Sequence, residues 1–153
     1  MPNILIVEDE EAIRRVLKKV LSEDDSKNNI LEASDGVEAI NKIKTENLQL
    51  VICDIKMPKK DGLDVLNFLK SYDDKIPIIM ISGHATVAIA VEATRLGAYE
   101  FIEKPFSKEK ILNYVNRALE SASLKKEKST SKAPSTTKTG RLRASKVRLI
   151  KTK

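Results

Sequence analysis

The residues of this sequence that are best able to do chemistry are acids that directly follow short apolar runs. Glu8, Asp9 and Glu10 come immediately after the apolar residues 4–7, and Asp54 comes immediately after a second apolar run. Carboxylates that are held close together repel one another unless a cation neutralises them. With no histidine or cysteine partner, the ligands would all be oxygen atoms, which suits Mg²⁺ rather than zinc or copper. The sequence therefore predicts a Mg²⁺ site.

Ser82 and Lys104 follow later apolar runs in the same way. Ser82 comes after residues 78–81, and Lys104 comes shortly after the weaker run 98–102. A lysine ammonium and a serine hydroxyl can each donate to a phosphoryl oxygen, and an aspartate can act as a nucleophile that forms an acyl phosphate. The combination indicates phosphoryl chemistry on an aspartate. Taken alone, the acids after residue 7 could instead be residues that favour the first turn of a helix.

The elements that would position these residues alternate along the chain. Apolar runs rich in β-branched residues indicate strands covered on both faces, and patterns with a helical period indicate helices between them. Five such pairs predict an α/β fold, a doubly wound five-stranded parallel sheet with helices on both faces. Ligands bind at the carboxyl ends of the strands in this fold, where the acids, Ser82 and Lys104 would meet. The predicted strands are residues 4–7, 29–33, 50–53, 78–81 and 98–102, and the predicted helices are residues 10–21, 35–43, 63–69, 86–96 and 107 to about 121.

Charge divides the chain into two unlike regions. Residues 1–120 hold 17 basic and 21 acidic residues, whereas residues 121–153 hold 11 basic residues and one acid, so the overall charge of +6 is an average of the two. The end of the chain is also polar and rich in serine and threonine. We therefore expect a domain at residues 1–122 and a basic tail at residues 123–153 that is disordered from about residue 124.

Cysteine content and hydropathy exclude several classes of protein. Cys53 is the only cysteine, so no internal disulfide can form, and its place in an apolar run predicts that it is buried. The sequence has no apolar run of about 18 residues, which argues against a membrane span, and no leader pattern. We expect a soluble protein that stays in the cytoplasm.

Four short blocks resemble the signature motifs of response-regulator receiver domains, the phosphoacceptor domains of two-component systems. They are residues 7–10, 54–58 with 61–62, 82–85 and 104–106, in the order and at the spacing of the family. The resemblance covers about residues 3–120 and is greatest to the receivers of nitrogen-regulatory, sigma-54-dependent activators of the NtrC and NtrX type. It implies a flavodoxin-like sheet with the strand order 2-1-3-4-5.

The resemblance also implies which residues bind the metal. Asp54 would be the phosphoacceptor and would contact Mg²⁺. Asp9 would bind the ion directly, Glu8 would act on it through water, and the backbone carbonyl of Lys56 would complete the set. Glu8 stands where the family more often has aspartate, so the acidic pair is kept while its geometry differs.

The remaining site residues have implied roles in phosphate binding and switching. Ser82 and Lys104 would bind phosphoryl oxygens, and Phe101 would turn inward when Ser82 moves toward the phosphate. His84, together with Lys56, would flank the site and tune the lifetime of the acyl phosphate. The peptide bond before Pro105 would be cis.

A member of this family would be a phosphorylation-controlled switch in a two-component phosphorelay, with a sensor histidine kinase as phosphodonor. It would catalyse only its own phosphorylation and dephosphorylation, so we do not expect a metabolic enzyme. The output face would comprise the fourth helix, fifth strand and fifth helix, about residues 86–120. Receivers of this kind often form homodimers through that face.

The residues after 120 leave three alternatives open. The chain could be a stand-alone receiver that acts by protein–protein contact, or a transcription regulator whose basic tail contacts DNA phosphates. It could also be a receiver truncated from an ATPase and DNA-binding module. Against DNA binding, the sequence shows no helix-turn-helix pattern and the tail lacks aromatic residues. Against an ATPase, it has no Gly-x-x-x-x-Gly-Lys-Ser/Thr loop.

Overall fold

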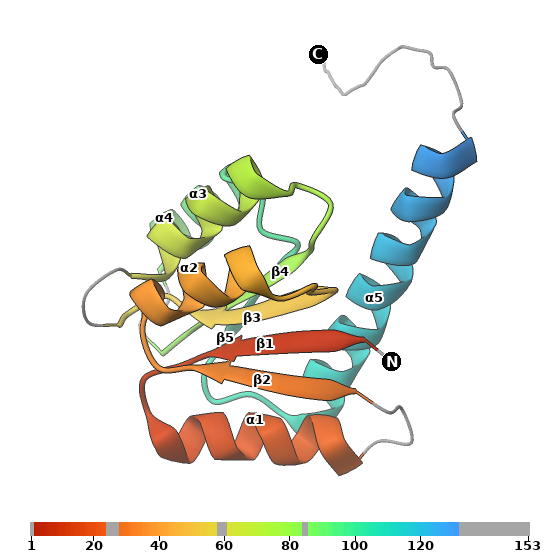
Figure 1. Cartoon of the computed structure of the whole chain (residues 1–153). Coiled ribbons are helices and arrows are strands. Elements are labelled where there is room, and N and C mark those ends of the chain that lie inside the picture. Colours follow the sequence, from red (N-terminus) through yellow and green to blue (C-terminus); the bar gives the residue numbers. More distant parts are fainter. Residues whose placement is uncertain (1, 24–27, 58–60, 84–85, 132–153) are drawn as a thin grey trace. The chain divides into compact units, whose positions relative to one another are not determined.

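The computed structural model describes residues 2–23, 28–57, 61–83 and 86–131, through which strands and helices alternate (Figure 1). Contacts group the chain into two units, Met1–Ala122 and Ser123–Lys153, and the sheet belongs to the first. The strands are β1 (Asn3–Val7), β2 (Asn29–Ala33), β3 (Leu50–Asp54), β4 (Ile78–Ser82) and β5 (Glu100–Glu103). The helices are α1 (Glu11–Glu23), α2 (Gly36–Thr45), α3 (Gly62–Tyr72), α4 (Val87–Arg95) and α5 (Lys108–Ser131).

The five strands form one parallel sheet in the order β2-β1-β3-β4-β5, which confirms the predicted fold class and strand order. In the register of the sheet, Ile4 on β1 lies opposite Ile30 on β2 and Leu50 on β3. The chain moves outward from β1 to β2 and then returns to β3 on the other side. The strand order therefore switches between β1 and β3, and ligands bind at the carboxyl ends of the strands that flank such a switch.

Helices cover both faces of the sheet, which explains why its strands are continuous apolar runs. Ile4 and Ile6 of β1 pack in a cluster with residues of α1 and α5, whereas Leu5 and Val7 pack in a cluster with residues of α2, α3 and α4. In Figure 1, α2, α3 and α4 lie above the sheet and α1 lies below it. Cys53 on β3 is fully buried in the cluster on the α2–α4 face, as predicted.

Side-chain caps fix where four of the helices begin. Asp35, Asp61 and Thr86 each accept a hydrogen bond from the backbone N–H three residues further on, at the starts of α2, α3 and α4. The Ser107 hydroxyl caps α5 in the same way, at the residue where the sequence predicts that this helix begins. The helix boundaries otherwise differ from the predicted ones by a few residues.

The end of α5 corrects the sequence prediction. The helix runs to Ser131, although the sequence predicted an end near residue 121 and disorder from about residue 124. The prediction is wrong for residues 124–131, because their leucine, lysine and glutamate residues are good helix formers. Residues 132–153, with most of the predicted tail, lie outside the described part of the chain. Among the described residues, no helix has the length and apolar character that a membrane span requires.

Candidate functional site

Three carboxylates meet at the carboxyl ends of the two central strands. Glu8 and Asp9 directly follow β1, and Asp54 is the last residue of β3. One carboxylate oxygen from each residue lies within 4.8 Å of the others. Glu8 and Asp54 are buried, with exposed fractions of 1% and 5%, whereas Asp9 is exposed. The strand topology thus brings together acids that lie more than forty residues apart in the sequence.

The ammonium group of Lys104 lies among these acids. Its Nζ atom is 3.0 Å from Glu8 Oε1, 3.4 Å from Asp54 Oδ1 and 3.9 Å from Glu10 Oε1. The backbone N–H of Lys104 donates to the carbonyl of Ser82 at the end of β4, so this hydrogen bond fixes the backbone of Lys104 against β4. Lys104 is therefore a counter-ion that the buried acids share. The direct ion pair with Glu8 was not predicted from the sequence.

Burial sets the protonation of this group. Desolvation raises the pKa of Glu8 to about 7, against the opposing effect of the Lys104 hydrogen bond and with a further increase from the charge of Asp54. Desolvation also raises the pKa of Asp54, against the attraction of Lys104. Burial alone would lower the pKa of Lys104, but its hydrogen bond to Glu8 and the charge of Asp54 raise it. Both carboxylates therefore hold protons more tightly than usual, so cation binding at these acids would compete with protonation.

The other predicted site residues lie at different depths. Ser82 is buried at the end of β4, and Phe101 on β5 is half-buried against the core cluster of the α2–α4 face. Lys56, just after β3, is exposed. The Lys104–Pro105 peptide bond is cis. His84 lies outside the described residues.

A cavity of about 550 Å³ adjoins the acids. Its polar lining comes from Asp9, Lys56 and Asp61, so the cavity opens onto the exposed member of the acidic group. A small molecule could therefore reach Asp9 from this side. The apolar lining consists of Ile55, Met57, Leu63 and Ile89.

Gly62, the first residue of α3, lies directly against the backbone of the phosphoacceptor candidate Asp54. Its N–H donates to the carbonyl of Ile55 over 2.7 Å. A Cβ atom at position 62 would lie 2.2 Å from the carbonyl oxygen of Asp54 and 2.7 Å from Cα of Ile55. No side chain fits in this space. The sequence places Gly62 in a family motif, but it does not predict the contact with Asp54. The only signal was the Asp61-Gly62 pair, which is typical of a tight turn.

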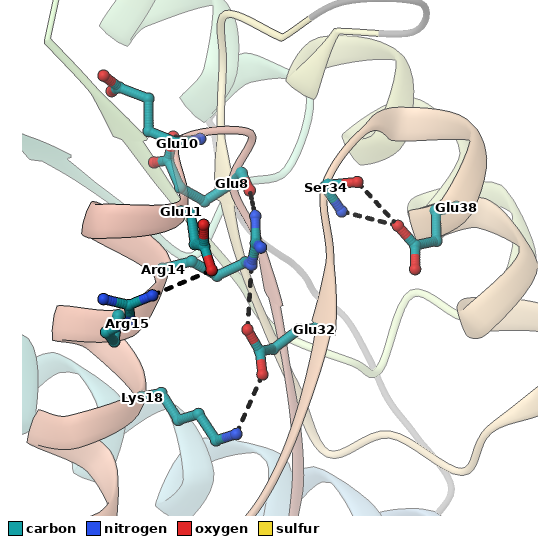
Figure 2. A network of polar contacts seen from close by, with 9 residues as sticks. All are labelled: Glu8, Glu10, Glu11, Arg14, Arg15, Lys18, Glu32, Ser34 and Glu38. Carbon is teal, nitrogen blue, oxygen red and sulfur yellow. Dashed lines mark hydrogen bonds and ion pairs between the residues drawn. The ribbon is translucent and has the colours of Figure 1, made fainter.

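Arg14 on α1 links the acidic loop to β2 (Figure 2). Its Nη1 donates to the Glu8 carbonyl over 2.8 Å, and its Nε donates to Glu32 Oε1 over 3.0 Å. Lys18 donates to the other oxygen of Glu32 over 3.1 Å. Burial would raise the pKa of Glu32, but the hydrogen bonds from Lys18 and Arg14 lower it. Sequence reasoning missed this network, although a cation near a helix N-terminus, where the helix dipole disfavours it, was a signal.

The donor set fits a hard divalent cation. Glu8, Asp9 and Asp54 offer only oxygen atoms, and Mg²⁺ prefers one or two carboxylates together with waters. Two of the three acids, Glu8 and Asp54, are buried and have raised pKa values. A small cation bound between them would stabilise their charged forms.

Residues 4–116 match the family of the response regulator receiver domain. The chain belongs to this family. Receiver domains of response regulators are signalling switches of two-component systems rather than classical enzymes, and the family implies a histidine kinase as a partner. Receiver domains typically bind Mg²⁺ at an acidic pocket, and Glu8, Asp9 and Asp54 form an acidic cluster of this kind.

Similar proteins include long regulators and single receiver domains. An NtrX-like response regulator of Rickettsia bellii is 35% identical over 127 residues, which are 82% of this chain but 26% of that protein. The chemotaxis protein CheY of Bacillus subtilis is 34% identical over 116 residues, which are 76% of this chain and 96% of CheY. A beryllofluoride-activated NtrC4 receiver domain dimer, solved in solution, is 37% identical with a TM-score of 0.75, and the match covers 80% of this chain and 99% of that one. The receiver thus spans about a quarter of its NtrX-like relative.

Proposed function

We propose that this receiver is phosphorylated on Asp54 by a histidine kinase in a Mg²⁺-dependent reaction, and that phosphorylation alters its α4–β5–α5 face. The observation that carries the proposal is the grouping of Glu8, Asp9 and Asp54 within 4.8 Å, with the Lys104 ammonium 3.4 Å from Asp54. Phosphoryl transfer onto a carboxylate needs a nucleophile and preorganised positive charge around the transferred group. These residues supply a nucleophile, a lysine and a cluster of oxygen ligands for a cation.

Asp54 would act as the nucleophile. An oxygen of its carboxylate attacks the phosphorus of a phosphohistidine, and the new O–P bond forms as the P–N bond breaks. The electron pair of the broken bond stays with the imidazole nitrogen of the kinase. Lys104 donates to one phosphoryl oxygen, and the Ser82 hydroxyl at the adjacent strand end donates to another.

Metal binding and phosphoryl binding would both change the contacts of Glu8 and Lys104. A bound Mg²⁺ would supply positive charge that offsets the charge of the phosphoryl group. Glu8 holds Lys104 at 3.0 Å, so the phosphoryl group would compete with Glu8 for the ammonium. We propose as ligands of the ion Asp9 and Asp54 directly, Glu8 through water and the backbone carbonyl of Lys56.

The α4–β5–α5 face supports a role in output. Val87 and Val91 on α4 have exposed fractions of 81% and 58%, and Tyr99, next to β5, is 36% exposed. Movement of Ser82 toward the phosphoryl group would draw Phe101 inward and shift this face between two arrangements. The similar NtrC4 receiver is a dimer in its beryllofluoride-activated form. We propose that this receiver also dimerises, through its own α4–β5–α5 face. A phosphorylated receiver that still sediments as a monomer in analytical ultracentrifugation would argue against the dimer.

Intact mass after incubation with acetyl phosphate tests the phosphorylation. The wild-type chain is expected to gain one phosphoryl group in MgCl₂ and none in excess EDTA. The Asp54→Asn variant, which keeps the size of the side chain but loses the nucleophile, should gain none in either condition. A gain by Asp54→Asn equal to that of the wild type would show that another residue is the acceptor. No gain by the wild type would reject the proposal.

A second candidate function rests on the charge of the chain after residue 120, where the sequence contains 11 basic residues and one acid. In this alternative the basic end contacts DNA phosphates without sequence preference. A gel shift on duplex DNA at low salt should then appear with the full chain and disappear on deletion of residues 124–153. A shift that survives the deletion, or no shift at all, would remove the alternative. Both functions fit the cytoplasmic location that we propose.

A further inference from the structure

The loop that carries Glu8 and Asp9 is held from outside the acidic site. The N–H of Glu8 donates to the carbonyl of Ala33 at the end of β2, over 3.0 Å. The carbonyl of Glu8 accepts a hydrogen bond from Arg14 Nη1, over 2.8 Å. The backbone of Glu8 is therefore fixed on both sides, once by the neighbouring strand and once by a charged side chain of α1.

Arg14 is itself held in place (Figure 2). Its Nε donates to Glu32, which lies on β2 opposite Ile6 of β1, and Lys18 holds the second oxygen of Glu32. A guanidinium group is planar and rigid, so fixing its Nε also fixes the direction in which Nη1 points. Arg14 has an exposed fraction of 18%, much lower than that of Lys18 at 51%, so its position is also restricted by packing.

The carbonyl that Arg14 holds belongs to the peptide unit between Glu8 and Asp9. That unit is planar, so the direction of the Glu8 carbonyl also sets the direction of the Asp9 N–H and Cα. A rotation of this plane about the Cα–C bond of Glu8 would move the Asp9 side chain relative to that of Glu8. Arg14 thus controls the relative placement of two of the three carboxylates, although it touches neither of them.

We infer that Arg14, anchored by Glu32, is a positioning residue that sets the affinity of the acidic site for Mg²⁺. The inference rests on the proposed function, because it assumes that Glu8, Asp9 and Asp54 hold the ion. Groups that orient the ligands of a metal typically change its affinity by a factor of about 10 to 100 when they are lost. Loss of Arg14 should therefore act through binding of the ion rather than through the transfer of the phosphoryl group.

Calorimetric titration of the full chain with MgCl₂ at neutral pH tests this inference. Arg14→Ala is expected to bind Mg²⁺ about tenfold more weakly than the wild type. Arg14→Lys keeps the charge but cannot bridge Glu8 and Glu32 with a planar fork, so it should also bind more weakly. The matched control is Lys18→Ala, which removes a cation from the same glutamate without contact to Glu8 and should stay within about twofold of the wild type.

A second readout separates positioning from a general loss of structure. The rate of phosphorylation of Arg14→Ala by acetyl phosphate should return to the wild-type value at saturating Mg²⁺, whereas a damaged fold would lower the rate at every concentration. If Arg14→Ala does not fold, Glu32→Ala provides the test, because it leaves Arg14 in place without its anchor and should also weaken Mg²⁺ binding. Wild-type affinity for Mg²⁺ in Arg14→Ala or Arg14→Lys would overturn this inference and leave the proposed function standing. Absence of binding to the wild type would overturn the proposed function as well.

Discussion

Replacing Gly62 with alanine is expected to destabilise the receiver by roughly 3 kcal/mol, because the new methyl group would overlap backbone rather than movable side chains. The Cβ atom would lie 2.2 Å from the carbonyl oxygen of Asp54, so either α3 or the end of β3 must shift. A shift of α3 would also lengthen the 2.7 Å hydrogen bond from Gly62 to Ile55. Urea unfolding followed by circular dichroism measures the change, and phosphorylation should slow because Asp54 moves with its backbone.

Gly83→Ala is the matched control for this substitution. A Cβ atom at position 83 would lie 3.5 Å from Cδ of Lys104, an ordinary contact with a flexible side chain. Its effect on the free energy of unfolding should stay within about 1 kcal/mol. If Gly62→Ala and Gly83→Ala unfold at the same urea concentration as the wild type, the close approach of α3 to Asp54 is not a structural requirement.

The stability of the metal-free receiver is expected to fall between about pH 4.5 and 7. The folded state raises the pKa of Glu8 from 4.5 to about 7, so it binds more protons than the unfolded chain over this interval. Stability then decreases with rising pH, and Glu8 alone contributes a loss of roughly 3 kcal/mol across the interval. Asp54, whose pKa is also raised, changes stability in the same direction. Urea unfolding in EDTA at several pH values measures the slope.

Glu8→Gln and added Mg²⁺ test the cause of this slope. Glutamine resembles the protonated acid, so the variant should be more stable than the wild type above pH 7 in EDTA and should show a flatter profile. Mg²⁺ should stabilise the wild type most at high pH, where it binds the folded state without displacing protons. Glu32 provides a contrast, because its lowered pKa produces a loss of stability as the pH falls below about 4.5. A metal-free wild type whose stability rises from pH 5 to 7 would contradict the role assigned to Glu8.

The sequence could predict that these side chains lie at one edge of the sheet because one rule connects residue order to position. A polar residue that interrupts a buried apolar run marks the end of a strand, and the carboxyl ends of parallel strands share one edge of the sheet. Asp54 and Ser82 each end a strand, and Glu8 and Lys104 each directly follow one. Family resemblance added the roles of these residues, which residue types alone would not distinguish from a simple cation site.

Contacts that depend on side-chain length and helix placement could not be predicted in the same way. Glu8 and Lys104 are 96 residues apart, and the 3.0 Å hydrogen bond between their side chains depends on rotamers that a sequence pattern does not specify. The approach of Gly62 to Asp54 depends on where α3 packs, which a periodic pattern does not specify. The end of α5 differs from the prediction because a polar, basic composition indicates disorder, whereas the local helix propensity of residues 124–131 continues the helix to Ser131.

Cys53 makes the receiver suited to site-specific chemical labelling. The single thiol of the chain is fully buried on β3, and desolvation raises its pKa well above the ordinary value, so little thiolate forms. Native protein should therefore react slowly with maleimides and disulfide reagents. A cysteine introduced on an exposed surface such as α4 would be the one site that these reagents reach, and a fluorophore or spin label could be attached there without first removing Cys53.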